Sequence, residues 1–291
     1  MNFTGSMTAM VTPFRNCTID EKALRDFIEW QIASGTDGLI PSGTTGEAAT
    51  LTLAEKAQLF RITVEQAKGR VPVIAGTGSN STAHAIELGK LAFECKADAH
   101  LSVTPYYNKP TQEGLYQHYK AIAAAVDLPM ILYNVPGRTA VNMLATTQLR
   151  LAELPRIVGT KEASGNLEQI KEIAQQIPKK FVILSGEDAQ NVEISAIGGQ
   201  GHISVTSNVA PDKLAQTWDL FAAGKLEEAR KVQAELQALH KVMFVESNPV
   251  PAKTALSIIR GYSTEVRLPL VELSAAAKQE LVTVLQKYHY A

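Results

Sequence analysis

The sequence predicts an α/β fold, a (β/α)8 barrel with a C-terminal helical appendage, and three features indicate it. Short apolar runs alternate with amphipathic segments through the first three quarters of the chain, as in repeated strand–helix units around a parallel sheet. Eight such units can be counted, and the chain of 291 residues exceeds the roughly 250 residues typical of this barrel. After Pro211 the strand-like runs stop and the pattern is helical. A doubly wound open sheet is the second possibility for the same alternation.

The predicted strands are short apolar runs, and amphipathic segments separate them. They cover residues 6–11, 38–41, 73–75, 99–103, 130–133, 157–161, 181–184 and 201–205. Between the first five strands, helices are predicted at residues 21–34, 53–68, 83–94 and 114–125. Thr52 and Glu55 have the spacing of a capping box, and Ser81 and Thr111 are the predicted N-caps of the next two helices.

We expect a catalytic barrel at residues 1–224 and a C-terminal helical domain at residues 225–291. The helices of the second part are predicted at residues 226–245, 251–260 and 274–288. No glycine-rich, serine-rich or charged linker marks the junction near Lys225. The boundary therefore depends on the change of pattern alone.

Composition favours a small-molecule partner in the cytoplasm. Lys and Arg number 28 against 29 Asp and Glu, for a net charge of -1, which lacks the charge excess of a nucleic-acid or anionic-membrane binder. Cys17 and Cys95 are far apart and have no metal-ligand spacing, so both are predicted to be free thiols. The first residues do not have the pattern of a signal peptide, and no apolar run approaches transmembrane length.

Lys161 is the most informative residue, because it stands alone in the apolar run 157–161. Side chains alternate along a strand, so Lys161 shares a face with Ile157 and Gly159 and should point into a poorly hydrated interior. Desolvation lowers the pKa of a lysine amine and leaves more of it unprotonated and nucleophilic. Such an amine can condense with a carbonyl compound to form a Schiff base. A core lysine paired with a carboxylate, or one that reaches solvent, is the structural alternative.

Other reactive side chains follow predicted strands at the same end of the barrel, where catalytic groups of this fold lie. The turn 43–47 offers two threonine hydroxyls and backbone N–H groups that suit a small carboxylate. Tyr133 could exchange protons with the Thr44 hydroxyl, and Arg138 could bind a carboxylate through two hydrogen bonds. Each feature alone has an ordinary structural reading, as a turn, a core aromatic or a surface ion pair. Their shared end of the sheet indicates a site.

Neither a metal nor an external cofactor is predicted. Gly76 and Gly78 follow a predicted strand and approach the dinucleotide-binding fingerprint, but the third glycine is missing and a barrel loop explains the segment equally well. The six histidines have no metal-ligand spacing.

Five motifs together closely resemble the dihydrodipicolinate synthase (4-hydroxy-tetrahydrodipicolinate synthase) family, within the class I pyruvate aldolase and N-acetylneuraminate lyase superfamily. The resemblance spans nearly the whole chain, and the set is far more specific than any one motif. The motifs are Gly43-Thr44-Thr45-Gly46-Glu47, Val103-Thr104-Pro105-Tyr106-Tyr107-Asn108, Leu132-Tyr133-Asn134-Val135-Pro136-Gly137-Arg138-Thr139, Gly159-Thr160-Lys161-Glu162-Ala163 and Leu184-Ser185-Gly186.

The resemblance implies a lyase that condenses pyruvate with L-aspartate 4-semialdehyde in lysine and diaminopimelate biosynthesis. It implies that Lys161 forms a Schiff base with pyruvate. It assigns a proton relay to Tyr133, Thr44 and Tyr107, the last supplied by a neighbouring subunit of a homotetramer built as a dimer of dimers. The substrate-binding residues that it implies are Thr45, Arg138, Gly186 and Ile203.

The resemblance also locates a regulatory site for lysine, in a degenerate form. The corresponding positions are Ala49, Leu53, Lys56, Asn80, His84 and Tyr106. Feedback-inhibited members of the family have histidines and an acidic residue where this chain has Leu53, Lys56 and His84. A cationic Lys56 and a missing carboxylate at His84 both disfavour a cationic amino acid. Weak or absent inhibition by L-lysine is therefore predicted.

Two other functions remain open at this point. The first is a related pyruvate-dependent lyase or aldolase that acts on N-acetylneuraminate or a 2-keto-3-deoxy sugar acid; members of this kind usually lack an arginine at the position of Arg138. The second is a barrel that binds a keto acid without catalysis, because this fold has many functions. Lys161 beside a tyrosine relay disfavours the second.

Overall fold

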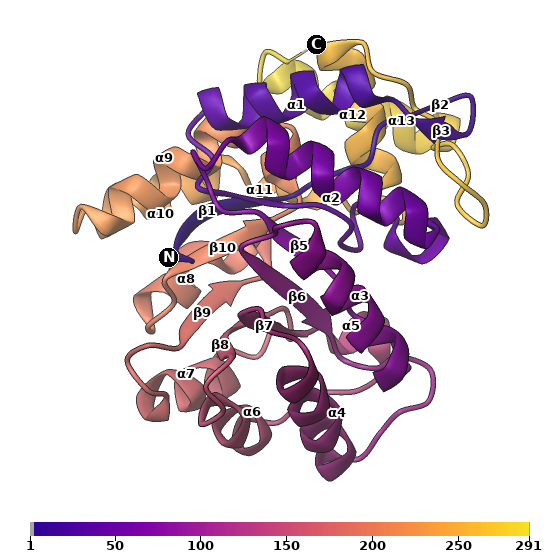
Figure 1. The fold of residues 1–291 in the computed structure, drawn as a ribbon. Helices are drawn as coiled ribbons and strands as arrows, with labels where there is room; N and C mark the ends of the chain where they lie inside the picture. The colour runs from indigo at the N-terminus through magenta and orange to yellow at the C-terminus, as the bar shows by residue number, and fades with distance from the viewer. Residues whose placement is uncertain (1–2, 291) are drawn as a thin grey trace.

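Eight parallel strands form the centre of the structure, a computed structural model that describes residues 3–290 (Figure 1). The strands are β1 (Gly5–Ala9), β4 (Gly38–Ile40), β5 (Ile74–Gly76), β6 (Ala99–Val103), β7 (Met130–Asn134), β8 (Ile157–Glu162), β9 (Val182–Ser185) and β10 (Gly201–Ser204). Their order is β4-β1-β10-β9-β8-β7-β6-β5. A parallel bridge between Leu39 and Val73 joins the two outer strands and closes the sheet. The predicted barrel is confirmed, and the open-sheet alternative is wrong.

Helices follow the strands and cover the outside of the barrel (Figure 1). They are α1 (Glu21–Ala33), α2 (Leu53–Ala67), α3 (Thr82–Glu94), α4 (Gln112–Ala125), α5 (Pro136–Thr139), α6 (Ala145–Ala152), α7 (Leu167–Gln176), α8 (Asn191–Ala196) and α9 (Pro211–Ala222). Three 3-10 helices, η1 (Ala48–Thr50), η2 (Asp188–Gln190) and η3 (Thr206–Asn208), follow strands β4, β9 and β10. The capping box of Thr52 and Glu55 is present, and Ser81 and Thr111 cap α3 and α4 as predicted.

Two local features differ from the prediction. The segment predicted as one helix over residues 226–245 is two, α10 (Leu226–Glu235) and α11 (Gln237–Val242). Around this break, the side-chain amides of Gln233 and Gln237 donate to carbonyl groups of η2. A small hairpin of β2 (Phe14–Arg15) and β3 (Thr18–Ile19) was not predicted, because two-residue strands are too short to show a periodic pattern.

The barrel interior is filled by apolar side chains that alternate strands contribute. Met7, Ile40, Leu101 and Ile203 are buried there with further members of one cluster. Tyr133 belongs to the same cluster, which places its ring inside the barrel rather than under the helices. Strand parity places Gly159 and Lys161 on the interior face as predicted, opposite Ile131 and Tyr133. The prediction is wrong for Ile157, which packs in the outer cluster because the register shifts between Met130 and Ile131.

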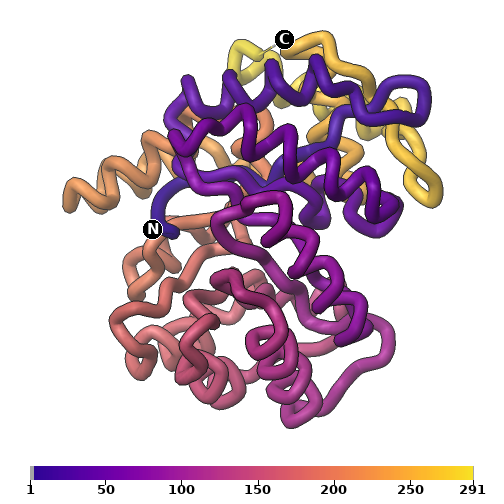
Figure 2. The backbone as a smooth tube through the Cα atoms, in the orientation of Figure 1, coloured from indigo at the N-terminus to yellow at the C-terminus, as the bar shows by residue number. Residues whose placement is uncertain are grey.

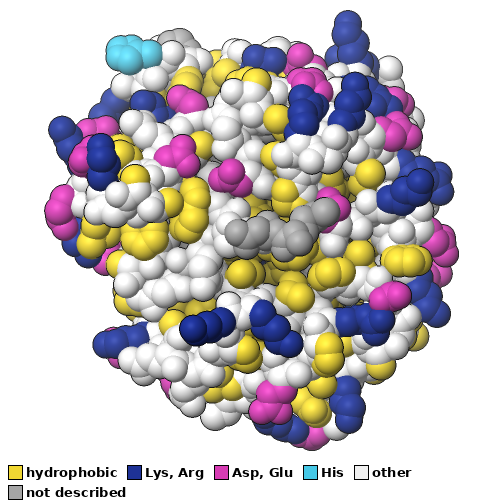
Figure 3. Space-filling view, turned by 60° about the vertical axis from the view of Figure 1, so that its left-hand side comes forward, with side chains coloured by type: hydrophobic (Ala, Val, Ile, Leu, Met, Phe, Trp, Pro, Cys, Tyr) yellow, Lys and Arg dark blue, Asp and Glu magenta, His cyan; other side chains and the backbone are white. Residues whose placement is uncertain are grey.

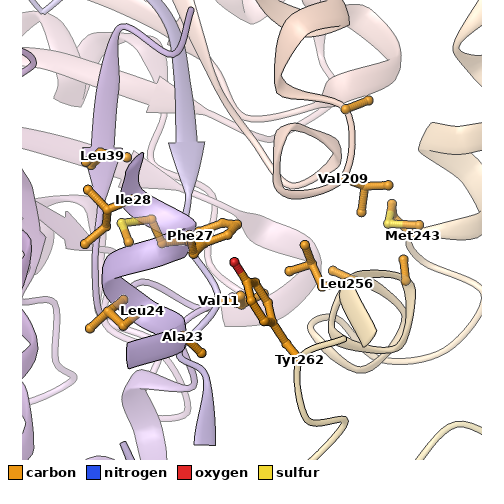
Figure 4. Packing of buried hydrophobic residues seen from close by; sticks show 14 of the residues in the cluster. Val11, Ala23, Leu24, Phe27, Ile28, Leu39, Val209, Met243, Leu256 and Tyr262 are labelled. Carbon is orange, nitrogen blue, oxygen red and sulfur yellow. The ribbon is translucent and has the colours of Figure 1, made fainter. Parts of the chain in front are cut away.

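The C-terminal helices pack against the first helices of the chain. After α12 (Val250–Arg260), Tyr262 lies edge-on to Phe27 of α1, with ring centroids 6.4 Å apart. Figure 4 shows this ring among Val11, Phe27 and Leu256. The last helix, α13 (Ala275–Lys287), adds Leu281 to the same apolar cluster. Figure 2 shows the yellow C-terminal end of the chain beside the indigo N-terminal helix. The proposed boundary at residues 224 and 225 remains a prediction.

The surface carries charges of both signs. On the face shown in Figure 3, Lys and Arg side chains alternate with Asp and Glu side chains, as expected for a net charge of -1. Within residues 3–290, no helix is long and apolar enough to cross a membrane.

Candidate active site

Lys161 and Tyr133 form the centre of the candidate site. They are direct partners in the register of neighbouring strands β8 and β7, so both side chains point to the same face of the sheet. The Lys161 Nζ lies 4.4 Å from the centre of the Tyr133 ring. Only 5% of Lys161 is exposed. The predicted interior position of the amine is therefore confirmed.

The barrel interior changes the protonation of Lys161. Burial lowers the pKa of its amine to about 8, and the nearby charge of Asp188 opposes this effect. At pH 7 the unprotonated fraction rises from about one in three thousand for an ordinary lysine to roughly one in ten. The amine is thus a usable nucleophile near neutral pH.

Gly186, just after β9, leaves the space that the Lys161 side chain occupies. A Cβ built on Gly186 would lie 2.8 Å from Lys161 Cε and 3.1 Å from Lys161 Cγ. Contacts this close are not tolerated between carbon atoms, so a larger residue would push the amine from its position. The predicted involvement of Gly186 thus has a steric basis in this structure.

The Thr44 side chain lies near the Tyr133 phenol at the cavity. Burial raises the pKa of the Tyr133 phenol, while Arg138 and the Thr44 side chain both lower it. The phenol therefore stays protonated near neutral pH and can act as a proton donor beside the Lys161 amine. The fold brings Tyr133 and Thr44 to the same cavity, although 89 positions separate the two residues in sequence.

A cavity of about 430 Å³ opens from this pair toward solvent. Its polar lining includes Thr44, Tyr133 and Arg138, which come from three different loops or strand ends. Arg138 lies on α5 and its side chain is exposed at the cavity. A small anionic ligand could therefore lie between a phenol, a hydroxyl and a guanidinium group.

The turn 43–47 is held by its own backbone and by distant residues. Gly46 N–H donates to Gly43 O and Glu47 N–H donates to Thr44 O, both at 3.1 Å. Thr45 is buried, and its hydroxyl accepts a hydrogen bond from Asn248 Nδ2 at 3.0 Å. The Thr44 side chain is exposed to the cavity instead. The two threonines therefore have different surroundings: Thr45 is buried and hydrogen-bonded to Asn248, and Thr44 faces the cavity.

Five of the predicted catalytic and substrate-binding residues do not line this cavity: Lys161, Thr45, Gly186, Tyr107 and Ile203. Tyr107 is 89% exposed and does not line the cavity within this chain, while Ile203 on β10 is buried in the barrel interior. Tyr107 also has a positive φ of 73°, a conformation that non-glycine residues adopt rarely. Its role remains a prediction.

Four of the six residues of the predicted lysine site line the same cavity, namely Ala49, Lys56, His84 and Tyr106. Lys56 is buried there, and its amine donates to Ala48 O at 2.7 Å and to Ser42 Oγ at 3.2 Å. Burial lowers the pKa of Lys56 to about 8. His84 Nδ1 lies 2.9 Å from a carboxylate oxygen of Glu87. Of the other two, Asn80 accepts through its carbonyl from Asn108 Nδ2, and Leu53 is exposed on α2.

Glu162 is a neighbour of the site that the sequence reasoning did not single out. It follows Lys161 on the opposite face of β8, where its carboxylate accepts from Asn134 Nδ2 at 3.0 Å, Ser164 Oγ at 2.7 Å and Gln148. Burial raises the pKa of Glu162, and these hydrogen bonds oppose the rise. The network ties the ends of β7 and β8 together and so fixes the backbone of Lys161. The sequence signal that could have identified Glu162 is its position directly after Lys161, at the end of an apolar run.

Asp188 on η2 is a second residue that the sequence reasoning missed. Its buried carboxylate accepts from the backbone N–H groups of Val205 at 3.0 Å and Thr206 at 2.8 Å. It is close enough to Lys161 to raise the pKa of that amine against the effect of burial. The sequence shows no periodic or motif signal for this role.

Gly76 and Gly78 serve close packing behind the turn 43–47 and strand β6. A Cβ on Gly76 would lie 2.1 Å from Ser42 O, and one on Gly78 would lie 2.3 Å from Val103 N. Close packing therefore explains why both positions hold glycine. Among residues 3–290, no group of three or more His, Cys, Asp or Glu side chains is placed to hold a metal ion.

We expect the rate of imine formation at Lys161 to rise with pH up to about 8 and then to level off. With an amine pKa of about 8, the reactive fraction grows about tenfold per pH unit below this value and little above it. Borohydride trapping of a small α-keto acid, followed by mass spectrometry at a series of pH values, measures this rate. A rate that keeps rising tenfold per unit beyond pH 9 would mean that burial does not lower this pKa.

Known proteins similar to this chain share its full length. The model of the dihydrodipicolinate synthetase family matches residues 2–288. The 4-hydroxy-tetrahydrodipicolinate synthase of Thermodesulfovibrio yellowstonii is 52% identical over 284 residues, 98% of both proteins. The solved chloride-inhibited dihydrodipicolinate synthase of Acinetobacter baumannii, complexed with pyruvate, is 44% identical with a TM-score of 0.97 and covers 100% of both chains. The Cyanidioschyzon merolae enzyme, solved with lysine bound, is 40% identical with a TM-score of 0.96 and covers 100% of both chains.

Proposed function

The chain belongs to the dihydrodipicolinate synthetase family, and on this basis we propose that it condenses pyruvate with L-aspartate 4-semialdehyde to give 4-hydroxy-tetrahydrodipicolinate and water. The observation that carries the proposal is the desolvated Lys161 amine, placed against the ring of Tyr133, which lines a cavity together with Arg138. The product belongs to lysine and diaminopimelate biosynthesis. The reaction needs no external cofactor, because the lysine imine itself serves as the electron sink.

The first half of the reaction forms a pyruvyl imine. The neutral Lys161 amine attacks the keto carbon, a carbon–nitrogen bond forms, and the keto oxygen becomes a hydroxyl group. The phenol of Tyr133, beside Nζ, donates a proton to this hydroxyl as it leaves as water. Thr44, which lies near this phenol, can return a proton to Tyr133. The result is a protonated imine.

The second half joins the two substrates. The relay of Tyr133 and Thr44 takes up a methyl proton, which converts the imine to an enamine. The enamine carbon attacks the aldehyde carbon of the semialdehyde, and the aldehyde oxygen takes a proton back from the relay and becomes a hydroxyl group. The amino group of the semialdehyde then attacks the imine carbon, the bond to Lys161 breaks, and the ring closes as the lysine amine is regenerated. One water is released overall, in the first half.

The cavity offers separate positions for the two carboxylates. The turn 43–47, with Thr44 and Thr45, is the proposed site for the pyruvate carboxylate, together with the main chain near Gly186 and Ile203. Arg138 at the cavity is the proposed partner of the semialdehyde carboxylate. This assignment favours a short amino-acid aldehyde over the polyol substrates of sugar-acid lyases.

Replacing Arg138 with Ala should raise the KM for the semialdehyde by about 10- to 100-fold and change the KM for pyruvate little, because one charge-assisted pair is lost. Steady-state kinetics with each substrate varied in turn measures both constants. An unchanged KM for the semialdehyde would favour the sugar-acid lyase alternative.

We propose a homotetramer, built as a dimer of dimers, in which Tyr107 of a neighbouring copy completes the relay. Its 89% exposure and positive φ support this role, because a phenol held in a costly conformation away from its own cavity suits contact with another subunit. The free thiols of Cys17 and Cys95 support the proposal that the protein functions in a reducing compartment, the cytoplasm.

We expect L-lysine at millimolar concentration to leave the activity nearly unchanged. The ammonium group of lysine would meet the Lys56 amine at the cavity, and the His84 position supplies no carboxylate. Titration of the steady-state rate with L-lysine tests this expectation. Replacing Lys56 with His and His84 with Glu provides the comparison, since it removes the cation and restores an acidic group. Strong inhibition of the native chain would refute the prediction.

The function is tested by supplying pyruvate with L-aspartate 4-semialdehyde and, separately, with N-acetylmannosamine or a short sugar aldehyde. Formation of the heterocycle only with the semialdehyde is the expected result. Turnover with a sugar aldehyde alone would move the assignment to the sugar-acid lyases. No turnover and no pyruvyl adduct with either would leave a binding protein.

A further inference from the structure

Three residues from the C-terminal part of the chain contact the turn 43–47 and hold it in place. Lys253 of α12 forms an ion pair with Glu47 at 2.7 Å, with side-chain exposures of only 2% and 1%. Arg267 donates its backbone N–H to the other carboxylate oxygen of Glu47 at 2.9 Å. Asn248, just before α12, donates to the Thr45 hydroxyl at 3.0 Å. Contacts from one distant segment therefore reach two of the five residues of the turn.

The turn needs such support because its last residue, Glu47, and the residue that precedes the turn, Ser42, are in an unfavourable conformation. Ser42 and Glu47 have φ values of 55° and 56°, in the left-handed region that L-residues with side chains rarely adopt. Such conformations persist only where the surrounding structure holds them. The ion pair with Lys253 holds Glu47 directly. Asn248 holds Thr45, which the proposed function places at the keto-acid carboxylate.

Glu47 is the carboxylate that forms an ion pair with Lys253 among residues 3–290, and the charge of Glu265 also favours the charged amine but has a smaller effect on its pKa. Its Nζ lies 2.7 Å from Glu47 Oε1 and 4.4 Å from the centre of the Phe14 ring. The Arg267 guanidinium also lies 4.4 Å from the centre of the same ring. Burying a lysine and a glutamate is costly even when they pair, and apolar residues of similar volume usually stabilise a fold as well or better. Stability alone therefore does not explain the buried pair of Lys253 and Glu47, whereas a role in fixing the geometry of the turn does.

Asn248 has a similarly specific placement. It is 5% exposed and lines the cavity that also contains Thr44 and Tyr133. Its Oδ1 has no hydrogen-bond partner among the described residues, so the only hydrogen bond of this side chain is the one to Thr45. The amide therefore fixes the rotamer of a hydroxyl at the proposed binding turn.

We infer that Lys253 and Asn248 are positioning residues for keto-acid binding, through Glu47 and Thr45. They hold the hydroxyl and N–H groups of the turn in the arrangement that accepts the carboxylate, so that binding does not have to order the turn. This inference rests on the proposed function, because it takes the turn 43–47 as the site of the pyruvate carboxylate. It predicts that loss of either contact weakens keto-acid binding more than it weakens the fold.

The test compares two designs that avoid a lone buried charge. One is Asn248→Ala, which removes a single neutral hydrogen bond. The other is the double variant Lys253→Met with Glu47→Gln, which removes both members of the ion pair together; the single Lys253→Met is not used alone, because it leaves an uncompensated carboxylate. Arg260→Met is the matched control, because Arg260 lies on the same helix and pairs with Asp26 at the surface.

The readouts are the half-saturating pyruvate concentration for borohydride trapping at Lys161, the KM for each substrate, and the melting temperature. We expect the half-saturating concentration to rise about tenfold in both designs, as for the loss of one or two buried polar contacts, with the KM for the semialdehyde within about twofold. The control should match the native chain.

Two outcomes would overturn the inference. Unchanged half-saturation by pyruvate with a lowered melting temperature in both designs would make these residues purely structural. A parallel rise in both KM values would place the effect on the whole cavity rather than on the turn. The native chain separates this result from failure of the proposed function: absence of any pyruvyl adduct on native Lys161 would refute both, whereas a normal native adduct leaves the proposed function intact.

Discussion

Lys161→Met should abolish pyruvate trapping and lower kcat by about 10⁴-fold or more, because methionine fills the same space without a nucleophile. The amine is 5% exposed, has its pKa lowered to about 8 by burial, and lies against Tyr133, so it combines a nucleophile with a neighbouring proton donor. Mass spectrometry after borohydride reduction, with peptide mapping, locates the adduct, and steady-state kinetics measures the rate.

Lys56→Met is the matched control for this experiment. Lys56 is a buried lysine that lines the cavity, and burial lowers its pKa to about 8 as well. Its amine donates to Ala48 O and Ser42 Oγ, so it is engaged by the turn rather than free to react. The adduct should remain on Lys161 in this variant. A pyruvyl adduct on Lys56 of the native chain, or on Lys161→Met at the native level, would contradict the mechanism.

Tyr133→Phe should lower kcat by about 10²- to 10³-fold while the KM for pyruvate changes little, because only the proton donor is lost. The phenyl ring stays in place beside Lys161, and the hydroxyl near Thr44 is lost. The trapped adduct should still form, but more slowly. Single-turnover measurement of imine formation separates this effect from product release.

Tyr119→Phe is the control for Tyr133→Phe. Tyr119 is buried as well, and its hydroxyl donates to Ser102 O at 3.2 Å, away from the cavity lining. Burial raises the pKa of both phenols. The two variants therefore share the loss of a buried hydroxyl but differ in its position. Equal losses of kcat would mean that the effect of Tyr133→Phe is structural.

The sequence by itself determined the features that depend on local pattern. Strand alternation placed Lys161 on the interior face of β8, and the structure confirms this position. The run of apolar segments gave all eight strands to within a few residues, and the capping box at Thr52 fixed the start of α2. The motifs indicated the family, and the match over residues 2–288 confirms it. Each of these signals is contained in a short stretch of chain.

Only the tertiary structure decided which distant residues meet. Glu47 and Lys253 are separated by 206 positions, and no periodic pattern relates them; closure of the barrel and packing of α12 against it bring them to 2.7 Å. The same holds for Asp188, whose effect on the Lys161 amine depends on the approach of η2 to the end of β8. Local patterns report the preference of a segment for a helix or a strand, whereas burial, pKa and hydrogen bonding depend on what the closed fold places beside it.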